Sequence, residues 1–449
     1  MLRRKIQSII VDYLTNGSNK ILIVNGARQI GKSYIIRYEG KRLFENYIEI
    51  DLWEDNYGPR IFSGIVSKED FYLRLSSVAG AKMGNKNNTL VFLDEIQVYP
   101  ELLTLLKFLK DDDRFTYIVS GSLLGIALNK APFKPGGRVD IIRMFQLDFE
   151  EFLWANGVGD DFIASVRDSF LKQESLVNPV HDRMLSLFKR YLLVGGLPDA
   201  VNKYVETHNI VEVRSAQDEV YRLYKADASQ YDKDHKLMIE RIYTLVPSYL
   251  ENKFKRVRYN EISGKEGDRY QNYTEEFEYL IQSGVCNEVR AISNPHFPLK
   301  ESEKKNLLKL YLNDVGLLTN IYYRYNISAV VDEIPSINLG TVYEQAVCGE
   351  LASHDYPLFY YDNKKKGEVD FLVDDHDNLS ILPLEVKSGK DYSKHVSLDT
   401  FVSNSDYGIK KAYVLSNERE VFAKGTVVYI PVYYVMFLRP SNPPENPFF

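Results

Sequence analysis

Short apolar runs alternate with amphipathic segments along the first 150 residues of the chain. The apolar runs have the length of buried strands, and the segments between them have the apolar spacing of helices. Strand-helix-strand repeats of this kind build a parallel sheet covered by helices. The pattern therefore predicts an α/β fold with a doubly wound parallel sheet. The expected strands span residues 20–25, 47–52, 89–94 and 115–120.

The pattern becomes helical from residue 149 to about residue 225, where apolar positions recur at three- and four-residue spacing. We expect a helical lid in this region. Within it, residues 194–198 read Val-Gly-Gly-Leu-Pro and end a helix, because glycine adopts left-handed conformations and proline cannot continue the hydrogen-bond ladder. A plain helix stop is the favoured interpretation, and a role near nucleotide stays open.

Residues 237–323 combine short helices with two strand-like runs, at 285–289 and 307–312, that flank a polar loop. This order favours a winged helix-turn-helix. Many such modules serve only as spacers between other parts of a protein, so DNA binding does not follow from the pattern.

The last part of the chain, from residue 338, has the pattern of a separate α/β domain. A helix is expected at residues 341–352, and a series of strands follows it. These strands are expected at residues 358–361, 368–373, 381–386 and 411–416.

Composition and charge exclude few functions. The chain has 449 residues, of which 45% are hydrophobic and 26% charged, as in globular proteins of several domains. A net charge of -6 gives no general attraction to nucleic acid or anionic lipid. Cys286 and Cys348 lie far apart in apolar stretches, which favours buried free thiols and a reducing cytoplasm. We expect no signal peptide at the start and no membrane insertion, because the longest apolar run, at 427–438, is too short to span a bilayer.

Residues 26–33 carry the first chemical motif, Gly-Ala-Arg-Gln-Ile-Gly-Lys-Ser, which fits the phosphate-binding loop GxxxxGK[ST]. In such a loop the backbone N–H groups at a helix start wrap the phosphates of ATP. Lys32 would bridge the β and γ oxygens, and the Ser33 hydroxyl would bind Mg²⁺. The expected nucleotide contacts are Gly26, Ala27, Arg28, Gln29, Ile30, Gly31, Lys32, Ser33, Tyr34 and Ser120.

The second motif is the apolar run Leu-Val-Phe-Leu that ends at Asp94 and Glu95, the arrangement known as Walker B. Asp94 would hold the magnesium through its water shell, and Glu95 would orient and polarise the attacking water. An ordinary glycine-rich turn next to a strand does not explain both motifs in this order. Together they predict ATP hydrolysis.

Further polar residues are candidates for the same site. Ser120 and Ser122 end the fourth expected strand, where either a sensor of the γ-phosphate or a simple turn fits equally well. Arg28 and Arg138 are candidates for stabilising transition-state charge, and Arg138 is the favoured one. Whether Arg138 acts within its own chain or on a neighbouring copy stays open.

A third constellation lies in the last domain, where residues 367–373 and 381–388 form an expected hairpin. If its strands pair, Asp370 and Glu385 converge as oxygen ligands for Mg²⁺, with Lys387 beside them. Glu344 on the preceding helix would complete the cluster. This D…ExK pattern matches nucleases of the restriction-endonuclease, PD-(D/E)xK, type, and an ordinary salt-bridged hairpin is the alternative.

Several of these motifs resemble those of a family of bacterial and archaeal ATPases. The matching stretches are Gly-Ala-Arg-Gln at 26–29, Leu-Asp-Glu-Ile-Gln at 93–97, Ser-Gly-Ser at 120–122, Gly-Arg at 137–138, Phe-Glu-Glu-Phe at 149–152, Asp-Val-Gly-Leu at 314–317 and Gly-x-x-Tyr-Glu at 340–344. The resemblance implies an N-terminal AAA-type P-loop domain and a C-terminal region called domain of unknown function 4143. One departure is visible at 146–148, where Gln-Leu-Asp replaces the usual Pro-Leu-Ser.

Four domains and three functions are expected. The domains are a P-loop ATPase domain at 1–150, a helical lid at 151–235, a winged helix at 236–325 and a nuclease-like domain at 326–449. The favoured function is Mg²⁺-dependent ATP hydrolysis that controls the nuclease-like domain. The alternatives are an ATP-gated, metal-dependent DNA nuclease and a nucleotide-dependent binding module without catalysis. Basic runs at 253–258 and 364–366 are candidate contacts for DNA, and a homo-oligomer or a protein partner also fits.

Overall fold

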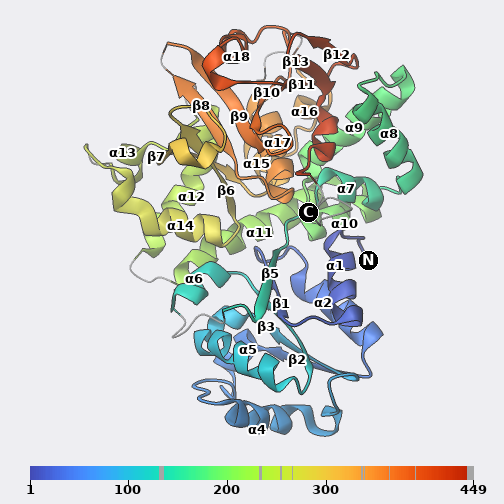
Figure 1. The fold of residues 1–449 in the computed structure, drawn as a ribbon, viewed down its shortest axis with the longest axis vertical. Coiled ribbons are helices and arrows are strands. Elements are labelled where there is room, and N and C mark those ends of the chain that lie inside the picture. Colours follow the sequence, from blue (N-terminus) through green and yellow to red (C-terminus); the bar gives the residue numbers. More distant parts are fainter. Residues whose placement is uncertain are drawn as a thin grey trace. The chain divides into compact units, whose positions relative to one another are not determined.

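The chain forms two compact units in the computed structural model (Figure 1). The structure describes residues 1–130, 136–231, 235–252, 255–264, 266–334, 337, 339–363, 365–389 and 391–441. Unit 1 contains Met1, Arg3–Phe145 and Glu278–Val285. Unit 2 contains Leu2, Gln146–Phe277 and Cys286–Phe449.

Unit 1 is built on a five-stranded sheet in the order β2-β3-β4-β1-β5, with all neighbours parallel. The four expected strands are confirmed. The fifth, β5, was missed because it is an edge strand with three of its five residues exposed, so no apolar run marks it. The strands are β1 Ile21–Asn25, β2 Asn46–Asp51, β3 Thr89–Asp94, β4 Thr116–Gly121 and β5 Val139–Arg143.

Helices cover both faces of this sheet. Alternate strand residues, such as Ile23, Val91 and Val119, form one core with apolar residues of α4, α5 and α6. The opposite face packs against α2, which contacts β2, β3 and β4 and pairs with α1. The helices of unit 1 are α1 Ile6–Asn16, α2 Lys32–Leu43, α3 Leu52–Tyr57, α4 Lys68–Ala79, α5 Pro100–Asp112 and α6 Leu124–Lys130, with short 3₁₀ turns η1 Gly80–Lys82 and η2 Ile96–Val98.

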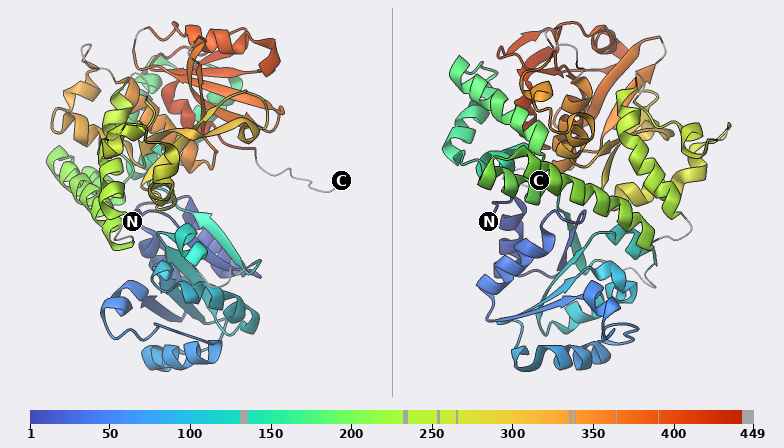
Figure 2. Two further views of the ribbon diagram at one scale, coloured as in Figure 1. Left: turned by 90° about the vertical axis from the view of Figure 1, so that its left-hand side faces the viewer. Right: turned by 180° about the vertical axis from the view of Figure 1, so that it is seen from behind.

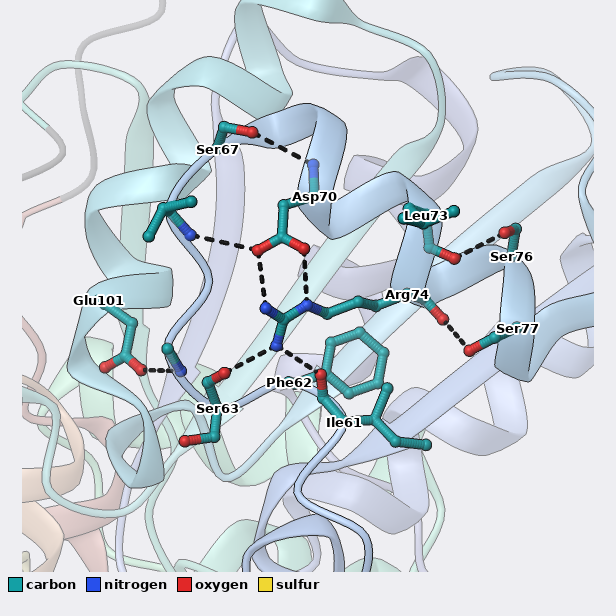
Figure 3. Close-up of polar contacts among 12 residues, drawn as sticks. Ile61, Phe62, Ser63, Ser67, Asp70, Leu73, Arg74, Ser76, Ser77 and Glu101 are labelled. Atoms are coloured by element: carbon teal, nitrogen blue, oxygen red, sulfur yellow. Dashed lines mark hydrogen bonds and ion pairs between the residues drawn. The ribbon is translucent and has the colours of Figure 1, made fainter.

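One arginine fixes the loop that leads into α4 (Figure 3). Arg74 forms two hydrogen bonds of 2.8 Å to the Asp70 carboxylate one turn earlier. Its remaining nitrogen donates to the backbone carbonyls of Ile61, at 2.8 Å, and Ser63, at 2.7 Å. Ser67 caps α4 by accepting a hydrogen bond from the Asp70 N–H. The loop is therefore anchored to the helix that it precedes.

Unit 2 begins with a helical region, as the sequence predicted. A glycine turn after α9 (Asn178–Val194) meets the carboxylate of Asp314, which accepts the Gly196 N–H at 2.6 Å. The same carboxylate caps α15 (Val315–Tyr323) by accepting the Leu317 N–H at 3.2 Å. An added Cβ at Gly195 would lie 2.1 Å from Asp314 Oδ1, so only glycine fits. The helices of this region are α7 Phe149–Ala155, α8 Asp160–Lys172, α9 Asn178–Val194, α10 Pro198–Thr207 and α11 Ile210–Tyr231.

The rest of unit 2 surrounds an eight-stranded sheet in the order β12-β13-β11-β10-β9-β8-β6-β7 (Figures 1 and 2). All six strands expected after residue 284 are confirmed. The strands are β6 Cys286–Ile292, β7 Glu303–Leu312, β8 Phe359–Asn363, β9 Gly367–Asp375, β10 Ser380–Val386, β11 Ala412–Ser416, β12 Phe422–Lys424 and β13 Val427–Pro431. The other helices are α12 Lys236–Glu251, α13 Tyr259–Ser263, α14 Thr274–Gln282, α15 Val315–Tyr323, α16 Ser328–Val331, α17 Gly340–Ser353 and α18 Val396–Val402, with 3₁₀ turns η3 Tyr270–Tyr273, η4 Leu299–Ser302, η5 Ser405–Tyr407 and η6 Val432–Phe437. From Glu278 onward α14 belongs to unit 1.

The hairpin of β6 and β7 does not stand alone. It joins the sheet because β6 also pairs with β8 in parallel. The apolar run at 427–438 forms the buried strand β13 and the turn η6. Cys286 and Cys348 are buried free thiols, as expected. Within the described part of the chain, no helix is both long and apolar enough to cross a membrane.

Burial raises the pKa of Asp314 to about 6, above an ordinary aspartate. Because the folded pKa exceeds the unfolded one, this group stabilises the fold most when protonated, and its contribution is lost as pH rises through about 6. We expect wild type to lose stability relative to Asp314→Asn between pH 5 and pH 7. The free energy of unfolding of wild type minus that of the variant should fall by about 1 kcal/mol over this range. Urea unfolding followed by Trp154 fluorescence in a Trp53→Phe background measures it.

Asp168→Asn, at an exposed position of α8, is the matched control and should show no such pH dependence. A constant difference between wild type and Asp314→Asn over this pH range would contradict a raised pKa.

Candidate functional site

The first candidate site is the loop between β1 and α2 in unit 1. Gly31 precedes α2 with a φ of 94°, a left-handed conformation that favours glycine. At Gly26 an added Cβ would lie 2.3 Å from the backbone oxygen of Met144, so the loop passes too close to that chain segment for a larger residue. The loop ends at a helix start, where backbone N–H groups have no partner within the helix and suit an anion.

Lys32 bends back over the loop. Its ammonium group donates hydrogen bonds to the backbone oxygens of Gly26, at 2.9 Å, and Ala27, at 2.8 Å, and the residue is 4% exposed. The positive charge is therefore held at the loop and shielded from solvent, where it interacts strongly with an anion.

Asp94, Ser33 and Ser120 meet beside the loop. The Asp94 carboxylate is buried and accepts hydrogen bonds from the hydroxyls of Ser120 and Ser33. Burial raises the pKa of Asp94 above its ordinary value, against the opposing effect of these two hydroxyls. A carboxylate and a hydroxyl are oxygen ligands of the kind that Mg²⁺ prefers, directly or through water.

Glu95 follows with a φ of 55°, an uncommon conformation for a non-glycine residue. Its carboxylate accepts hydrogen bonds from the Gln97 amide and, at 3.3 Å, from the Ser122 hydroxyl. Gln97 also donates to Ser122 at 3.1 Å. Sequence reasoning assigned no role to Gln97, although it belongs to the quoted Leu-Asp-Glu-Ile-Gln stretch. In the structure it holds the Glu95 side chain in place.

Other loop residues are held by their surroundings. The guanidinium of Arg28 stacks on the Trp53 ring, 4.3 Å from its centre. The backbone oxygen of Ile30 accepts a hydrogen bond of 3.0 Å from Arg4, a buttress that the sequence did not reveal. Gln29 has a φ of 62°, and Tyr34 is 55% exposed.

Arg138 lies away from this site. Ile21 pairs with Val139 at the amino end of β1, whereas the loop leaves from the carboxyl end, where Asn25 pairs with Arg143. Arg138 also forms an ion pair of 2.7 Å with Asp111. The strand register therefore puts Arg138 at the opposite end of the strands from the loop of its own chain. Its action on a neighbouring copy stays a prediction.

The second candidate site lies in unit 2, where the expected hairpin forms as β9 and β10. The Asp370 carboxylate accepts the Val386 N–H at 2.8 Å, and Lys387 donates to Glu385 Oε1 at 2.7 Å. Glu385 Oε2 is buried and accepts no hydrogen bond within the described structure. Burial, and then the charge of Asp370, raise the pKa of Glu385 to about 8.

Glu344 reaches the same cluster from α17. Its carboxylate accepts hydrogen bonds from Lys255 and, at 3.2 Å, from the Tyr311 hydroxyl. Burial and the charge of Asp370 raise the pKa of Glu344 above its ordinary value. Lys309, which pairs with Glu368, is also close enough to lower that pKa. The three lysines near these carboxylates partly neutralise them, and sequence reasoning had found only Lys387.

The carboxylates of the second site are not spaced as a formed metal site. In the described part of the chain, the group whose three ligand atoms lie within 4.8 Å of one another is Asp148, Glu350 and His354, not the carboxylates of the second site. Asp370, Glu385 and Glu344 therefore interact electrostatically without meeting this distance.

The fold and the first site define an α/β protein with the parallel sheet and phosphate-loop arrangement of P-loop NTPases. Comparison with protein families then gives three matches: residues 18–153 match an AAA domain, 185–326 match domain of unknown function 8612, and 339–435 match domain of unknown function 4143. The chain thus combines an N-terminal AAA domain with a C-terminal domain of unknown function 4143, and the resemblance seen in its motifs is confirmed.

Solved structures resemble the chain only distantly. A Walker-type ATPase of Pyrococcus abyssi is 13% identical with a TM-score of 0.43, and the match covers 72% of this chain and 96% of that one. The RuvB Holliday junction branch migration motor of Thermotoga maritima is 17% identical with a TM-score of 0.26, covering 63% and 87%. Cdc6p of Pyrobaculum aerophilum is 12% identical with a TM-score of 0.26, covering 74% and 95%. No curated protein matches the chain.

The close approach at Gly26 gives a test of the loop. We expect Gly26→Ala to destabilise unit 1 by about 1 to 3 kcal/mol, because the new Cβ overlaps backbone that cannot move aside cheaply. Denaturant unfolding followed by Trp53 fluorescence measures the loss. Gly159→Ala is the control, since a Cβ there meets no heavy atom within 4 Å. Equal stability of Gly26→Ala and wild type would contradict the close approach of the loop backbone to Met144.

Proposed function

We propose that the protein binds ATP with Mg²⁺ and hydrolyses it, and that its nucleotide state controls the C-terminal nuclease-like domain. The observation that carries the proposal is the meeting of Lys32, Ser33, Asp94 and Ser120 at one edge of a parallel sheet, beside a loop that ends at a helix start. These groups supply a cation for phosphates and oxygen ligands for a metal, which are the two requirements of a nucleotide site.

Each residue has a defined part in this proposal. The N–H groups of residues 26–34 and the Lys32 ammonium bind the phosphates, while Ser33 and Asp94 hold the magnesium. Magnesium, when bound, neutralises charge that develops on the phosphate oxygens. Glu95 orients the attacking water and accepts its proton, and Gln97 and Ser122 fix the direction of that carboxylate.

Unit 2 is the part of the chain that responds to the nucleotide state. Helices α7–α11 of unit 2 act as the lid. A winged helix is formed by α12, α13, α14, β6 and β7, of which α14 belongs to unit 1 from Glu278 onward. Three helices followed by an antiparallel hairpin support the winged helix. The proposed boundaries remain 1–150, 151–235, 236–325 and 326–449. Arg138 keeps a role in catalysis only if it acts on a neighbouring copy of the chain.

Two substitutions test the ATPase. We expect Lys32→Ala to abolish nucleotide binding, because it removes the cation that the loop holds. We expect Glu95→Gln to keep binding and lower kcat by about 100-fold or more, because only the water-activating carboxylate is lost. Fluorescent ATP binding and phosphate release with Mg²⁺ measure the two steps.

Lys41→Ala removes the same charge from an exposed position on the same helix and serves as the control. Hydrolysis by Lys32→Ala at the rate of Lys41→Ala would rule out the proposed site.

A second candidate function is an ATP-gated, metal-dependent DNA nuclease. The elements α17, β8, β9, β10, α18 and β11 follow the order helix, three antiparallel strands, helix, parallel strand, which supports a restriction-endonuclease-like core. Asp370 and Glu385 would hold Mg²⁺ with Glu344, and Lys387 would activate water. The buried Glu385 oxygen without a hydrogen bond and the raised pKa of that carboxyl support a site that gains from a cation.

We expect Mg²⁺- or Mn²⁺-dependent nicking of DNA by wild type and its loss in Asp370→Asn and Lys387→Ala. The matched controls are Asp391→Asn and Lys394→Ala, an exposed ion pair after the hairpin. Plasmid nicking with and without ATP measures the activity. Equal nicking by Asp370→Asn and Asp391→Asn would assign any activity to a contaminant.

A binding module without catalysis is the third candidate. Arg256, Arg258 and Tyr259 line a cavity of about 440 Å³ in unit 2, and two exposed guanidinium groups beside an aromatic ring suit a nucleic-acid backbone. Residues 253, 254 and 364 of the basic runs lie outside the described residues. DNA binding by the Lys387→Ala variant without any cleavage by wild type would favour this function over the nuclease.

A further inference from the structure

One lysine from outside the nuclease-like domain reaches the carboxylate cluster of unit 2. Lys255 follows α12 in the expected winged-helix region, and its ammonium group forms an ion pair with Glu344 Oε1 on α17. The other oxygen, Glu344 Oε2, accepts a hydrogen bond of 3.2 Å from the Tyr311 hydroxyl on β7. Both oxygens of this expected metal ligand therefore have a partner within unit 2, and one of the partners is a cation.

The two other expected ligands are held differently. Asp370 accepts a hydrogen bond of 2.8 Å from the backbone N–H of Val386, a donor without net charge. Glu385 Oε1 accepts a hydrogen bond of 2.7 Å from Lys387, which belongs to the same D…ExK pattern. Glu385 Oε2 is buried and has no hydrogen bond within the described structure. A cation from another region of the chain thus covers Glu344, while Glu385 keeps an oxygen for an ion.

The position of Lys255 also agrees with the spacing of the three carboxylates. Asp370, Glu385 and Glu344 are close enough for their charges to act on one another. In the described part of the chain, however, their oxygens do not all come within 4.8 Å of one another. An ammonium group on Glu344 offsets the negative charge there and repels a second cation. Lys255 therefore opposes the binding of a divalent ion by Glu344.

We propose that Lys255 is a built-in competitor of the divalent metal ion for Glu344. While the ammonium group holds Glu344, the cluster binds an ion through Asp370 and Glu385 only. When Lys255 leaves, Glu344 becomes a third carboxylate ligand, and the ion binds more tightly because affinity rises with the number of charged oxygen ligands. This control rests on the metal-dependent nuclease function proposed for unit 2, and it lies outside the D…ExK pattern itself.

The segment that carries Lys255 also lines the cavity of unit 2. Two residues after Lys255, the N–H of Val257 donates to the backbone oxygen of Leu308 on β7 at 3.0 Å. Residues 256–259 line the cavity of about 440 Å³. A ligand in this cavity that shifts the segment therefore also moves Lys255, and it changes the affinity of the carboxylate cluster for its ion.

Manganese binding by the full-length chain without nucleotide tests the proposal. Mn²⁺ is the probe because it binds carboxylate oxygens as Mg²⁺ does, and electron paramagnetic resonance detects it. The binding that Asp370→Asn loses defines the ion at this cluster. We expect Lys255→Met, which removes the charge and keeps a long side chain, to bind that ion about tenfold or more tightly than wild type. Lys255→Arg keeps the charge on Glu344 and should bind Mn²⁺ like wild type.

Lys309→Met is the matched control for the loss of positive charge alone. Lys309 is close enough to Glu344 for its charge to act on that carboxylate, but it pairs with Glu368. Its removal therefore leaves Lys255 on Glu344, and the gain in Mn²⁺ affinity should be smaller than in Lys255→Met. An equal or larger gain would overturn the proposal, because loss of charge would then explain both variants.

The position of the ion gives a second measurement. Anomalous diffraction from crystals soaked in Mn²⁺ should place the wild-type ion on Asp370 and Glu385, and the ion of Lys255→Met on Glu344 as well. An ion on Glu344 next to Lys255 in wild type would overturn the proposal, even if Lys255→Met fails to fold. Equal affinity of wild type and Lys255→Met would also overturn it. Unchanged Mn²⁺ binding in Asp370→Asn would instead remove the metal site, and with it both the nuclease function and this control.

Discussion

The parallel register of β1, β3 and β4 is the constraint on which the candidate nucleotide site depends. Because these strands run in one direction, their carboxyl ends lie side by side at the same end of the sheet. The loop after Asn25 meets Asp94 and Ser120 there. A slip of one residue between neighbours would turn Asp94 to the other face of its strand and break its contacts with Ser33 and Ser120. The apolar residues of β1, β3 and β4 oppose such a slip, since they would leave their cores.

The backbone turn at Glu95 explains the network around its carboxylate. The chain leaves β3 in a left-handed turn, and this directs the Glu95 carboxylate toward Gln97 and Ser122 instead of back into the strand. A carboxylate with its direction fixed loses less entropy when it orients a water molecule. The strained backbone at this position thus has a physical use in the proposed reaction.

Unit 2 contains three kinds of buried carboxylate. Asp314 accepts hydrogen bonds from backbone N–H groups. Glu344 and Glu385 accept hydrogen bonds from lysines, and Asp148 and Glu350 lie close to His354. Each solution offsets the cost of taking a carboxylate out of water.

The sequence by itself determined the local elements and the motifs. Apolar periodicity located β1–β4 and most of unit 2, and Gly26, Lys32, Asp94 and Glu95 stood out because their chemistry follows from short-range order. Edge strand β5 escaped because its exposed side chains carry no apolar signal. Only the tertiary structure decided which distant residues meet: it excluded Arg138 from its own loop, brought Gln97 to Glu95, and joined Asp148 to His354. Such pairings depend on strand register and helix packing, which sum weak contacts over the whole core and leave no trace in any one stretch of sequence.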